Sequence, residues 1–226
     1  MIILTERLKK VAELIGKTEV LADIGCDHGY LPIHLLLKND ISFAYACDVR
    51  DGPLKAAKKN ISKYGLSDKT DIILSDGLIN ITDKKVNAIS ICGMGGRLIA
   101  KILSDSLEYA KTADKLILQP MTEVYVLRQF LADNGFVIEK EVLAREDDRF
   151  YNILCVKPGV EKYRDIFSIY FGGNLINSDD ELLLPYLEKN YRINLSNLKA
   201  KEGKEDTSVL KILVESLEKT IKSKKI

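Results

Sequence analysis

The chain is poor in the residues that build metal sites, disulfide frameworks and membrane spans. Its 226 residues include no tryptophan, two histidines, five prolines and four cysteines. Cys26, Cys47, Cys92 and Cys155 form no C-x-x-C pair, which excludes the usual zinc frameworks, so we expect buried free thiols and no metal. No run approaches the ~20 apolar residues of a membrane span, and the N-terminus lacks a signal pattern. We therefore expect a cytoplasmic protein with no membrane partner.

The chain has almost no excess of charge of either sign, because 34 Lys or Arg and 33 Asp or Glu leave a net charge of only +1. Its distribution is less even: residues 185–226 hold ten Lys or Arg against six Asp or Glu. Arg7, Lys9, Lys10 and Lys17 give the segment around residues 4–16 a second basic side. Each basic surface fits either a phosphate-backbone partner or a solvated helix face, and the sequence leaves both open.

Apolar runs and helical patterns alternate through the first two thirds of the chain. Repeated β-α units predict a mostly parallel sheet with helices on both faces, and a final hairpin adds an antiparallel strand. The fold class is therefore α/β. Strands are predicted at 20–24, 43–48, 70–77, 86–92, 115–121, 136–144 and 151–156, and helices at 4–16, 31–38, 53–64, 97–110 and 123–134.

The breaker pair Pro158-Gly159 predicts a domain boundary, with an α/β domain over 1–158 and a helical domain over 159–226. In the second domain, leucines recur at spacings of three and four over 184–198 and again over 210–221. Two such helices joined by a short polar turn are expected to pack as an antiparallel coiled-coil hairpin.

The stretch over residues 19–30 is the centre of the predicted site. Its apolar strand ends in Gly25 and Gly29, and glycine at such a turn allows a ligand to approach the main chain closely. Asp48 ends the next apolar run, where nucleotide-binding α/β folds hold ribose hydroxyls. Asp27 lies inside the turn, and its carboxylate would repel a pyrophosphate, so a nucleoside without pyrophosphate is favoured.

Ligands of parallel sheets bind at the carboxyl ends of the strands, so residues at those ends are the candidates. The predicted cofactor-binding residues are Asp23, Gly25, Cys26, Gly29, Asp48, Val49, Asp76, Gly77, Cys92 and Gly93. The predicted catalytic residues are Asp27, His28, Gly93 and Met94. The glycines offer bare backbone to a flat base, and Asp27 or His28 can anchor a polar group of the substrate.

Several motifs together resemble one family. The acid-x-G-x-x-x-G frame of Asp23 to Gly29 resembles the S-adenosylmethionine turn of Rossmann-like methyltransferases, although Asp27 stands where a third glycine is usual. The full set resembles the TrmK family of bacterial tRNA methyltransferases, which modify N1 of adenine 22. The motifs are Asp-Ile-Gly-Cys-Asp-His-Gly-Tyr-Leu-Pro (23–32), Gly-Met-Gly-Gly (93–96), Gln-Pro-Met (119–121) and Glu-Asp-Asp-Arg-Phe-Tyr (146–151).

The resemblance implies S-adenosyl-L-methionine as the cofactor and tRNA as the partner, with a monomer expected. In this fold, the segment between the last two strands is expected near the mouth of the crevice, where Arg149 could touch phosphate and Tyr151 could stack on a base. An exposed hairpin loop that includes Asp147 and Asp148 is the alternative. Two alternatives stay open. The same cofactor could serve a small molecule or protein substrate, or the coiled coil could dimerise a cofactor-binding scaffold that is not an enzyme.

Overall fold

The computed structural model describes residues 2–160 and 165–225. It divides into two compact units, Met1–Glu161 and Lys162–Ile226. The strand β7 runs as far as Pro158, so the first unit includes the whole sheet. The domain boundary between residues 158 and 159 stays a prediction.

A seven-stranded sheet in the order β3-β2-β1-β4-β5-β7-β6 forms the first unit. The first five strands are parallel, and β7 is antiparallel to both β5 and β6, as the sequence predicts. The strands are β1 (Val20–Ile24), β2 (Phe43–Asp48), β3 (Thr70–Leu74), β4 (Ala88–Gly95), β5 (Lys115–Thr122), β6 (Phe136–Glu146) and β7 (Arg149–Pro158).

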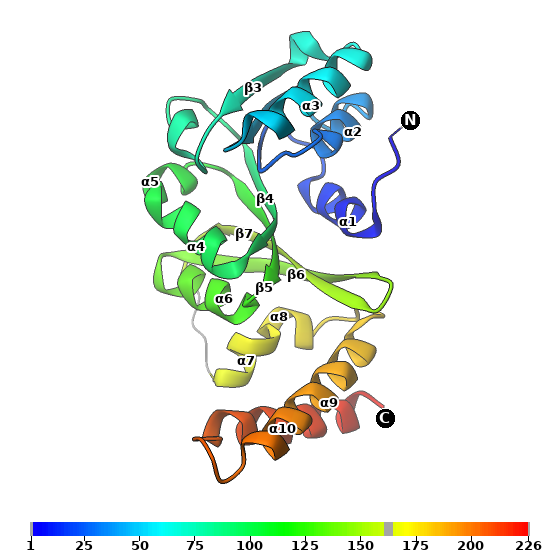
Figure 1. Cartoon of the computed structure of the whole chain (residues 1–226), viewed down its shortest axis with the longest axis vertical. Helices are drawn as coiled ribbons and strands as arrows, with labels where there is room; N and C mark the ends of the chain where they lie inside the picture. Colours follow the sequence, from blue (N-terminus) through cyan, green and yellow to red (C-terminus); the bar gives the residue numbers. More distant parts are fainter. Residues whose placement is uncertain (1, 161–164, 226) are drawn as a thin grey trace. The chain divides into compact units, whose positions relative to one another are not determined.

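Helices cover both faces of this sheet and enclose two hydrophobic cores (Figure 1). On one face lie α1 (Glu6–Ile15), α2 (Tyr30–Leu37) and α3 (Asp51–Lys63), and on the other lie α4 (Gly96–Asp105), α5 (Leu107–Ala110) and α6 (Val124–Asp133). Short 3-10 turns, η1 (Ser67–Lys69) and η2 (Ile79–Ile81), flank β3. The single helix predicted over 97–110 is wrong in one respect, because it breaks at Ser106 into α4 and α5.

Local sequence explains why α1 begins and ends where it does. The Thr5 hydroxyl accepts a hydrogen bond from the Leu8 amide at 3.4 Å, which caps the first turn, and Gly16 follows the last residue. Val11 and Ile15 are fully buried on one side. This anchoring matters for the site because it fixes the position of Arg7 in the first turn of the helix.

The second unit contains α7 (Ile166–Phe171), α8 (Gly173–Ile176), α9 (Leu183–Lys201) and α10 (Ser208–Lys224). Ion pairs Lys225–Glu188 (2.7 Å) and Lys211–Glu202 (3.9 Å) join opposite ends of the last two helices, so α9 and α10 form an antiparallel hairpin. Buried leucines lie between them, including Leu187, Leu213 and Leu217. Coiled-coil packing of this hairpin stays a prediction.

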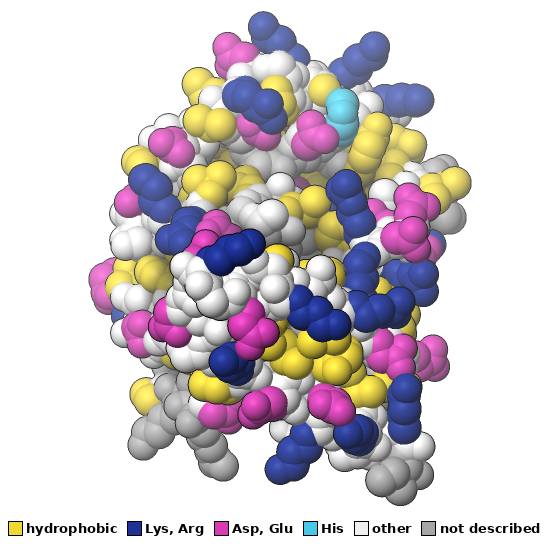
Figure 2. Space-filling model, turned by 60° about the horizontal axis from the view of Figure 1, so that its bottom comes forward, with side chains coloured by type: hydrophobic (Ala, Val, Ile, Leu, Met, Phe, Trp, Pro, Cys, Tyr) yellow, Lys and Arg dark blue, Asp and Glu magenta, His cyan; other side chains and the backbone are white. Residues whose placement is uncertain are grey.

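The surface carries charges of both signs. Figure 2 shows Lys and Arg side chains interspersed with Asp and Glu over one face. Among residues 2–160 and 165–225, no helix has the length and apolar character to cross a bilayer. Within the same ranges, no group of three or more His, Cys, Asp or Glu side chains could hold a metal ion.

Candidate active site

A pocket of about 560 Å³ opens at the carboxyl ends of the parallel strands. This is where open α/β sheets bind ligands. All of the predicted site residues except Gly29 line it. Those that do are Asp23, Gly25, Cys26, Asp27, His28, Asp48, Val49, Asp76, Gly77, Cys92, Gly93 and Met94. The fold therefore brings the predicted residues together at one pocket.

The turn after β1 is tied to the neighbouring strand by its backbone. The amides of Gly25 and Cys26 both donate to the Cys47 carbonyl, at 2.8 and 2.9 Å. Gly25 has φ of +73°, and a Cβ added there would lie 2.3 Å from the Met94 methyl carbon. Glycine thus lets the Met94 methyl group lie directly against the turn, and the turn and Met94 together form a cradle in the pocket wall.

Gly29 has a structural role instead of lining the pocket. Its φ is +70°, and it is the residue before α2 begins. A Cβ at this position would lie 3.3 Å from the Ala57 Cβ of α3. Gly29 therefore allows the chain to turn sharply into α2 while α2 and α3 stay close together.

Asp23, near the end of β1, is the most deeply buried acid of the pocket at 4% exposure. The Ser90 hydroxyl of β4 donates to Asp23 Oδ1 at 2.6 Å. Burial raises the pKa of Asp23 to about 6; the Ser90 hydrogen bond opposes this shift, and the negative charge of Asp48 adds to it. A cationic ligand group here would lower the pKa of Asp23 again and stabilise its ionised carboxylate.

Asp48 ends β2 and is only 5% exposed. Its Oδ1 accepts a hydrogen bond from the Arg50 amide at 3.0 Å. The Arg50 guanidinium lies 3.7 Å from the same carboxylate but is mostly exposed. Val49, also well exposed, lies beside them at the pocket wall. Asp48 is thus oriented by backbone, with an apolar neighbour suited to a nucleoside.

The segment after β3 adds the third acid. The strand ends at Leu74, so the prediction of a strand as far as Gly77 is wrong. Ser75 shapes the following loop, because its buried hydroxyl donates to the Gly77 carbonyl at 2.9 Å. A Cβ at Gly77 would lie 2.9 Å from Ile102 of α4. The loop therefore packs tightly against α4 and holds Asp76 at the pocket.

The glycine-rich stretch after Cys92 belongs to the sheet. We expected β4 to end at Cys92, but it continues to Gly95 through irregular pairing with β5. The Gly93 amide donates to the side-chain oxygen of Gln119 at 3.1 Å, and Gln119 is fully buried. Pairing with β5 therefore fixes the backbone of Gly93 and Met94 along the pocket wall.

Asp27 and His28 lie at the exposed side of the pocket. Their side chains approach to 3.6 Å, and the His28 ring stacks on Tyr30 with centroids 5.4 Å apart. Asp27 has φ of +49°, an uncommon value for a residue other than glycine. The turn thus presents a carboxylate and a ring to a ligand that enters from solvent.

Three comparisons decide the family. A family model described as a methyltransferase domain matches residues 4–154. The tRNA (adenine(22)-N(1))-methyltransferase of Bacillus subtilis strain 168 is 38% identical over 186 residues, covering 82% of this chain and 75% of that protein. The crystal structure of the B. subtilis m1A22 tRNA methyltransferase TrmK has a TM-score of 0.82 at 29% identity, covering 98% of this chain and 97% of that one. The chain belongs to the TrmK family.

A second TrmK structure bears on the pocket. M. capricolum TrmK, in complex with the natural cofactor product S-adenosyl-homocysteine, has a TM-score of 0.80 at 30% identity, and 97% of each chain is covered. The family resemblance stated from motifs is therefore confirmed. The Rossmann-like methyltransferase fold is confirmed as well.

Arg7 is a pocket residue of this TrmK-family chain that the sequence did not reveal. We placed Arg7 on a basic helix side, but it lines the pocket with Leu8. Its Nη1 donates to the Gln119 side-chain oxygen at 2.5 Å, and its guanidinium lies over the Tyr151 ring at 5.5 Å. Tyr151 is only 9% exposed, so the prediction that it stacks on a base is wrong, because Arg7 covers its ring.

The cysteines of the pocket are poor nucleophiles. Burial, followed by the negative charge of Asp23, raises the pKa of both Cys26 and Cys92 well above the usual range of a thiol. Both therefore remain neutral at physiological pH. They serve as small apolar wall residues, and all four cysteines of the chain are free.

Proposed function

We propose that this chain transfers a methyl group from S-adenosyl-L-methionine to N1 of adenine 22 in tRNA. The observation that carries the proposal is a glycine-cradled pocket with four carboxylates, in a chain 38% identical to a B. subtilis tRNA (adenine(22)-N(1))-methyltransferase. The small-molecule and scaffold alternatives gain no support from these relatives. A cytoplasmic location and a monomeric state stay predictions.

The pocket residues fit this cofactor better than a dinucleotide. Asp23, Asp27, Asp48 and Asp76 outnumber the two arginines among the lining residues. Such a wall disfavours a pyrophosphate and suits a sulfonium compound with an ammonium group. Asp48 would accept hydrogen bonds from the ribose hydroxyls, Asp76 would face the adenine edge, and the Gly25 cradle would take the amino-acid chain.

The cofactor supplies an electrophilic methyl group, and the chain supplies alignment. Adenine N1 already has a lone pair, so no base is required before attack. Holding the two reactants in line can contribute ~7–11 kcal/mol. The fixed backbone of Gly93 and Met94 would support the flat base. Positive charge that develops on the adenine makes its amino group more acidic, and Asp27 would stabilise that charge, with His28 as a polar anchor.

Adenine N1 takes part in base pairing, so the target must be exposed before it can react. Exposing a paired or stacked base costs a few kcal/mol. Phosphate contacts from basic side chains can offset this cost. The basic residues of the second unit and the exposed Lys9 and Lys10 of α1 are candidates for those contacts.

Transfer of label tests the proposal directly. Purified protein is incubated with methyl-labelled S-adenosyl-L-methionine and tRNA that lacks the modification, and the tRNA is then digested to nucleosides. We expect label in N1-methyladenosine, reduced about 100-fold or more for Asp48→Ala because a bidentate ribose contact is lost. Label in a different nucleoside would keep the cofactor and contradict the target. No label at all, despite cofactor binding, would overturn tRNA methylation.

The pKa of Asp23 predicts how cofactor affinity depends on pH. In the ligand-free pocket the pKa of the Asp23 carboxyl group is raised to about 6, so this group is mostly ionised above that pH and mostly protonated below it. An ammonium ligand favours the ionised form. Affinity for S-adenosylhomocysteine should therefore be constant above pH 7 and fall by up to about tenfold per pH unit below 6.

Calorimetry over pH 5 to 8 checks this prediction. In Ser90→Ala the hydrogen bond that lowers the pKa of Asp23 is absent, so the fall should begin at a higher pH. The control ligand is 5′-methylthioadenosine, which has no ammonium group and should show no such fall. A pH-independent affinity for S-adenosylhomocysteine would contradict a role for Asp23.

A further inference from the structure

Helix α3 carries a surface charge of almost one sign. Residues 50–69, which contain the helix, hold six Lys or Arg against two Asp. This excess of four equals that of residues 185–226, but it occurs in less than half the length. The helix has one acid, Asp51, and four lysines, which we call the α3 lysine stripe: Lys55, Lys58, Lys59 and Lys63.

The four lysines share the exposed side of the helix. The opposite, buried side consists of Leu54, Ala57 and Ile61. Every member of the stripe is exposed. Lys55, Lys59 and Lys63 follow one another at intervals of four residues, so they form a row with about 6 Å of rise between neighbours. Lys58 lies beside this row.

The stripe has no neutralising acid within the part of the chain that the structure describes. None of its four ammonium groups forms an ion pair there, whereas Lys101 of α4 and Lys157 of β7 both pair with carboxylates. Like charges four residues apart repel one another and weaken a helix. Only Lys63, in the last turn, is favoured by the helix dipole. The stability of α3 therefore does not explain the stripe.

Short contacts join α3 to the turn that opens onto the pocket. The side-chain amide of Asn60 donates to the His28 carbonyl at 2.9 Å. Ala57 lies against Gly29, where an added Cβ would be 3.3 Å from the Ala57 Cβ. Asp27 and His28 of this turn line the pocket at its exposed side. A molecule bound along α3 would therefore be held in a fixed position relative to the pocket.

Arg50 extends the basic surface from the stripe to the pocket itself. It is the residue before α3 begins, it lines the pocket, and its side chain is 73% exposed. Its guanidinium is partly neutralised by Asp48, at 3.7 Å. Cations thus continue from the pocket edge along the length of α3.

We infer that the α3 lysine stripe binds backbone phosphates of the RNA substrate and so positions the target nucleotide at the pocket. The inference rests on the proposed function, which supplies the RNA partner. Each ammonium group that neutralises a phosphate releases a condensed counterion, and this release favours binding. Such contacts fix position and orientation without reading bases. The stripe therefore supplies affinity and register, and base selection belongs to the pocket.

The salt dependence of tRNA binding tests the inference. Fluorescence anisotropy measures the affinity of the full chain for unmodified tRNA between about 50 and 200 mM salt. The stripe variant combines Lys55→Gln, Lys59→Gln and Lys63→Gln. Because three phosphate contacts are lost, the slope of log Kd against log salt should fall by about two to three, and affinity at ~0.15 M salt at least about tenfold. Glutamine and lysine have similar helix propensities, so α3 should persist.

Matched variants separate phosphate binding from net charge and from folding. Lys84→Gln, Lys101→Gln and Lys157→Gln together remove three charges from lysines that pair with carboxylates elsewhere in the first unit. This control variant should keep the slope of the unaltered protein. Arginine substitutions at the three stripe positions retain the charge and should also keep the slope. Affinity for S-adenosylhomocysteine should be the same in every variant.

The outcomes distinguish the stripe from the proposed function. An unchanged slope in the stripe variant, an equal fall in the control variant, or an accompanying loss of affinity for S-adenosylhomocysteine would overturn the stripe. Methylation of tRNA by the unaltered protein would still support the proposed function in each case. Conversely, if the unaltered protein bound tRNA through the stripe but transferred no methyl label, tRNA methylation would be overturned and the stripe would stand as an RNA-binding surface.

Discussion

Gly25→Val is expected to lower the affinity for S-adenosylhomocysteine at least about 100-fold while the chain still folds. A Cβ at this position would lie 2.3 Å from the Met94 methyl carbon. Met94 can swing away because the clash involves the end of a flexible side chain, so folding survives. The valine and the displaced Met94 side chain then take up space that the cofactor chain needs, and overpacking of this kind costs about 1–3 kcal/mol or more.

Backbone strain must be separated from this steric effect. Gly25 has φ of +73°, and a β-branched residue there is strained whatever the space. Gly65 provides the matched control, since its φ is +68° and no atom lies within 4 Å of an added Cβ. Gly65→Val should lose about 1–2 kcal/mol of stability, with unchanged affinity measured by calorimetry. Equal affinity losses in both variants would show that strain, and not the cradle, explains the effect.

The strand-end acids could be predicted because the signal is local. Asp23 and Asp48 each lie at the end of a short apolar run, and parallel strands bring such ends to one edge. The order of residues along each run was enough to place them at the pocket. No tertiary information was needed for this part of the site.

Arg7 could not be predicted in the same way. Its partner Gln119 is 112 positions away, and the hydrogen bond joins α1 to β5. On the sequence, Arg7 shares a helix with Lys9 and Lys10, which are in fact exposed and paired with Glu6 and Glu13. Helical periodicity describes which side of a helix is apolar, but it does not say which basic residue turns towards a pocket at the helix edge.

The end of β4 shows a second limit. A glycine-rich segment has low strand propensity, so the sequence favours a loop after Cys92. Pairing of Met94 with Pro120 and of Gly95 with Thr122 extends the strand nevertheless. A Cβ at Gly96 would lie 2.4 Å from the Glu123 carbonyl oxygen. The glycines thus allow two chain segments to approach closely, a requirement that only the tertiary structure reveals.

Arg128→Met is expected to destabilise the first unit by about 3–5 kcal/mol. Arg128 of α6 and Glu141 of β6 are completely buried and pair at 2.5 Å, with a second hydrogen bond at 3.3 Å. Asn152 of β7 donates to the same carboxylate at 2.9 Å. Removing the guanidinium leaves a buried carboxylate with only the amide for compensation. Urea denaturation followed by circular dichroism measures the loss.

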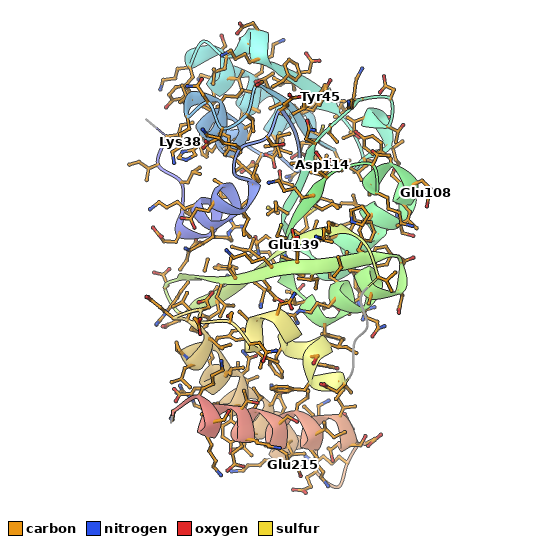
Figure 3. The ribbon with its side chains drawn as sticks, turned by 180° about the vertical axis from the view of Figure 1, so that it is seen from behind. Lys38, Tyr45, Glu108, Asp114, Glu139 and Glu215 are labelled. Atoms are coloured by element: carbon orange, nitrogen blue, oxygen red, sulfur yellow. The ribbon has the colours of Figure 1, made fainter. Side chains whose placement is uncertain are left out.

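A second substitution and a surface pair make the cause of this loss testable. Adding Glu141→Gln to Arg128→Met removes the uncompensated charge and keeps an acceptor for Asn152, so about half of the lost stability should return. Glu139, labelled in Figure 3, lies on β6 and pairs with Lys157 at 2.5 Å, but both side chains are about half exposed. Glu139→Gln should therefore cost less than about 1 kcal/mol. If the double variant were no more stable than Arg128→Met alone, lost packing and not the buried charge would account for the effect.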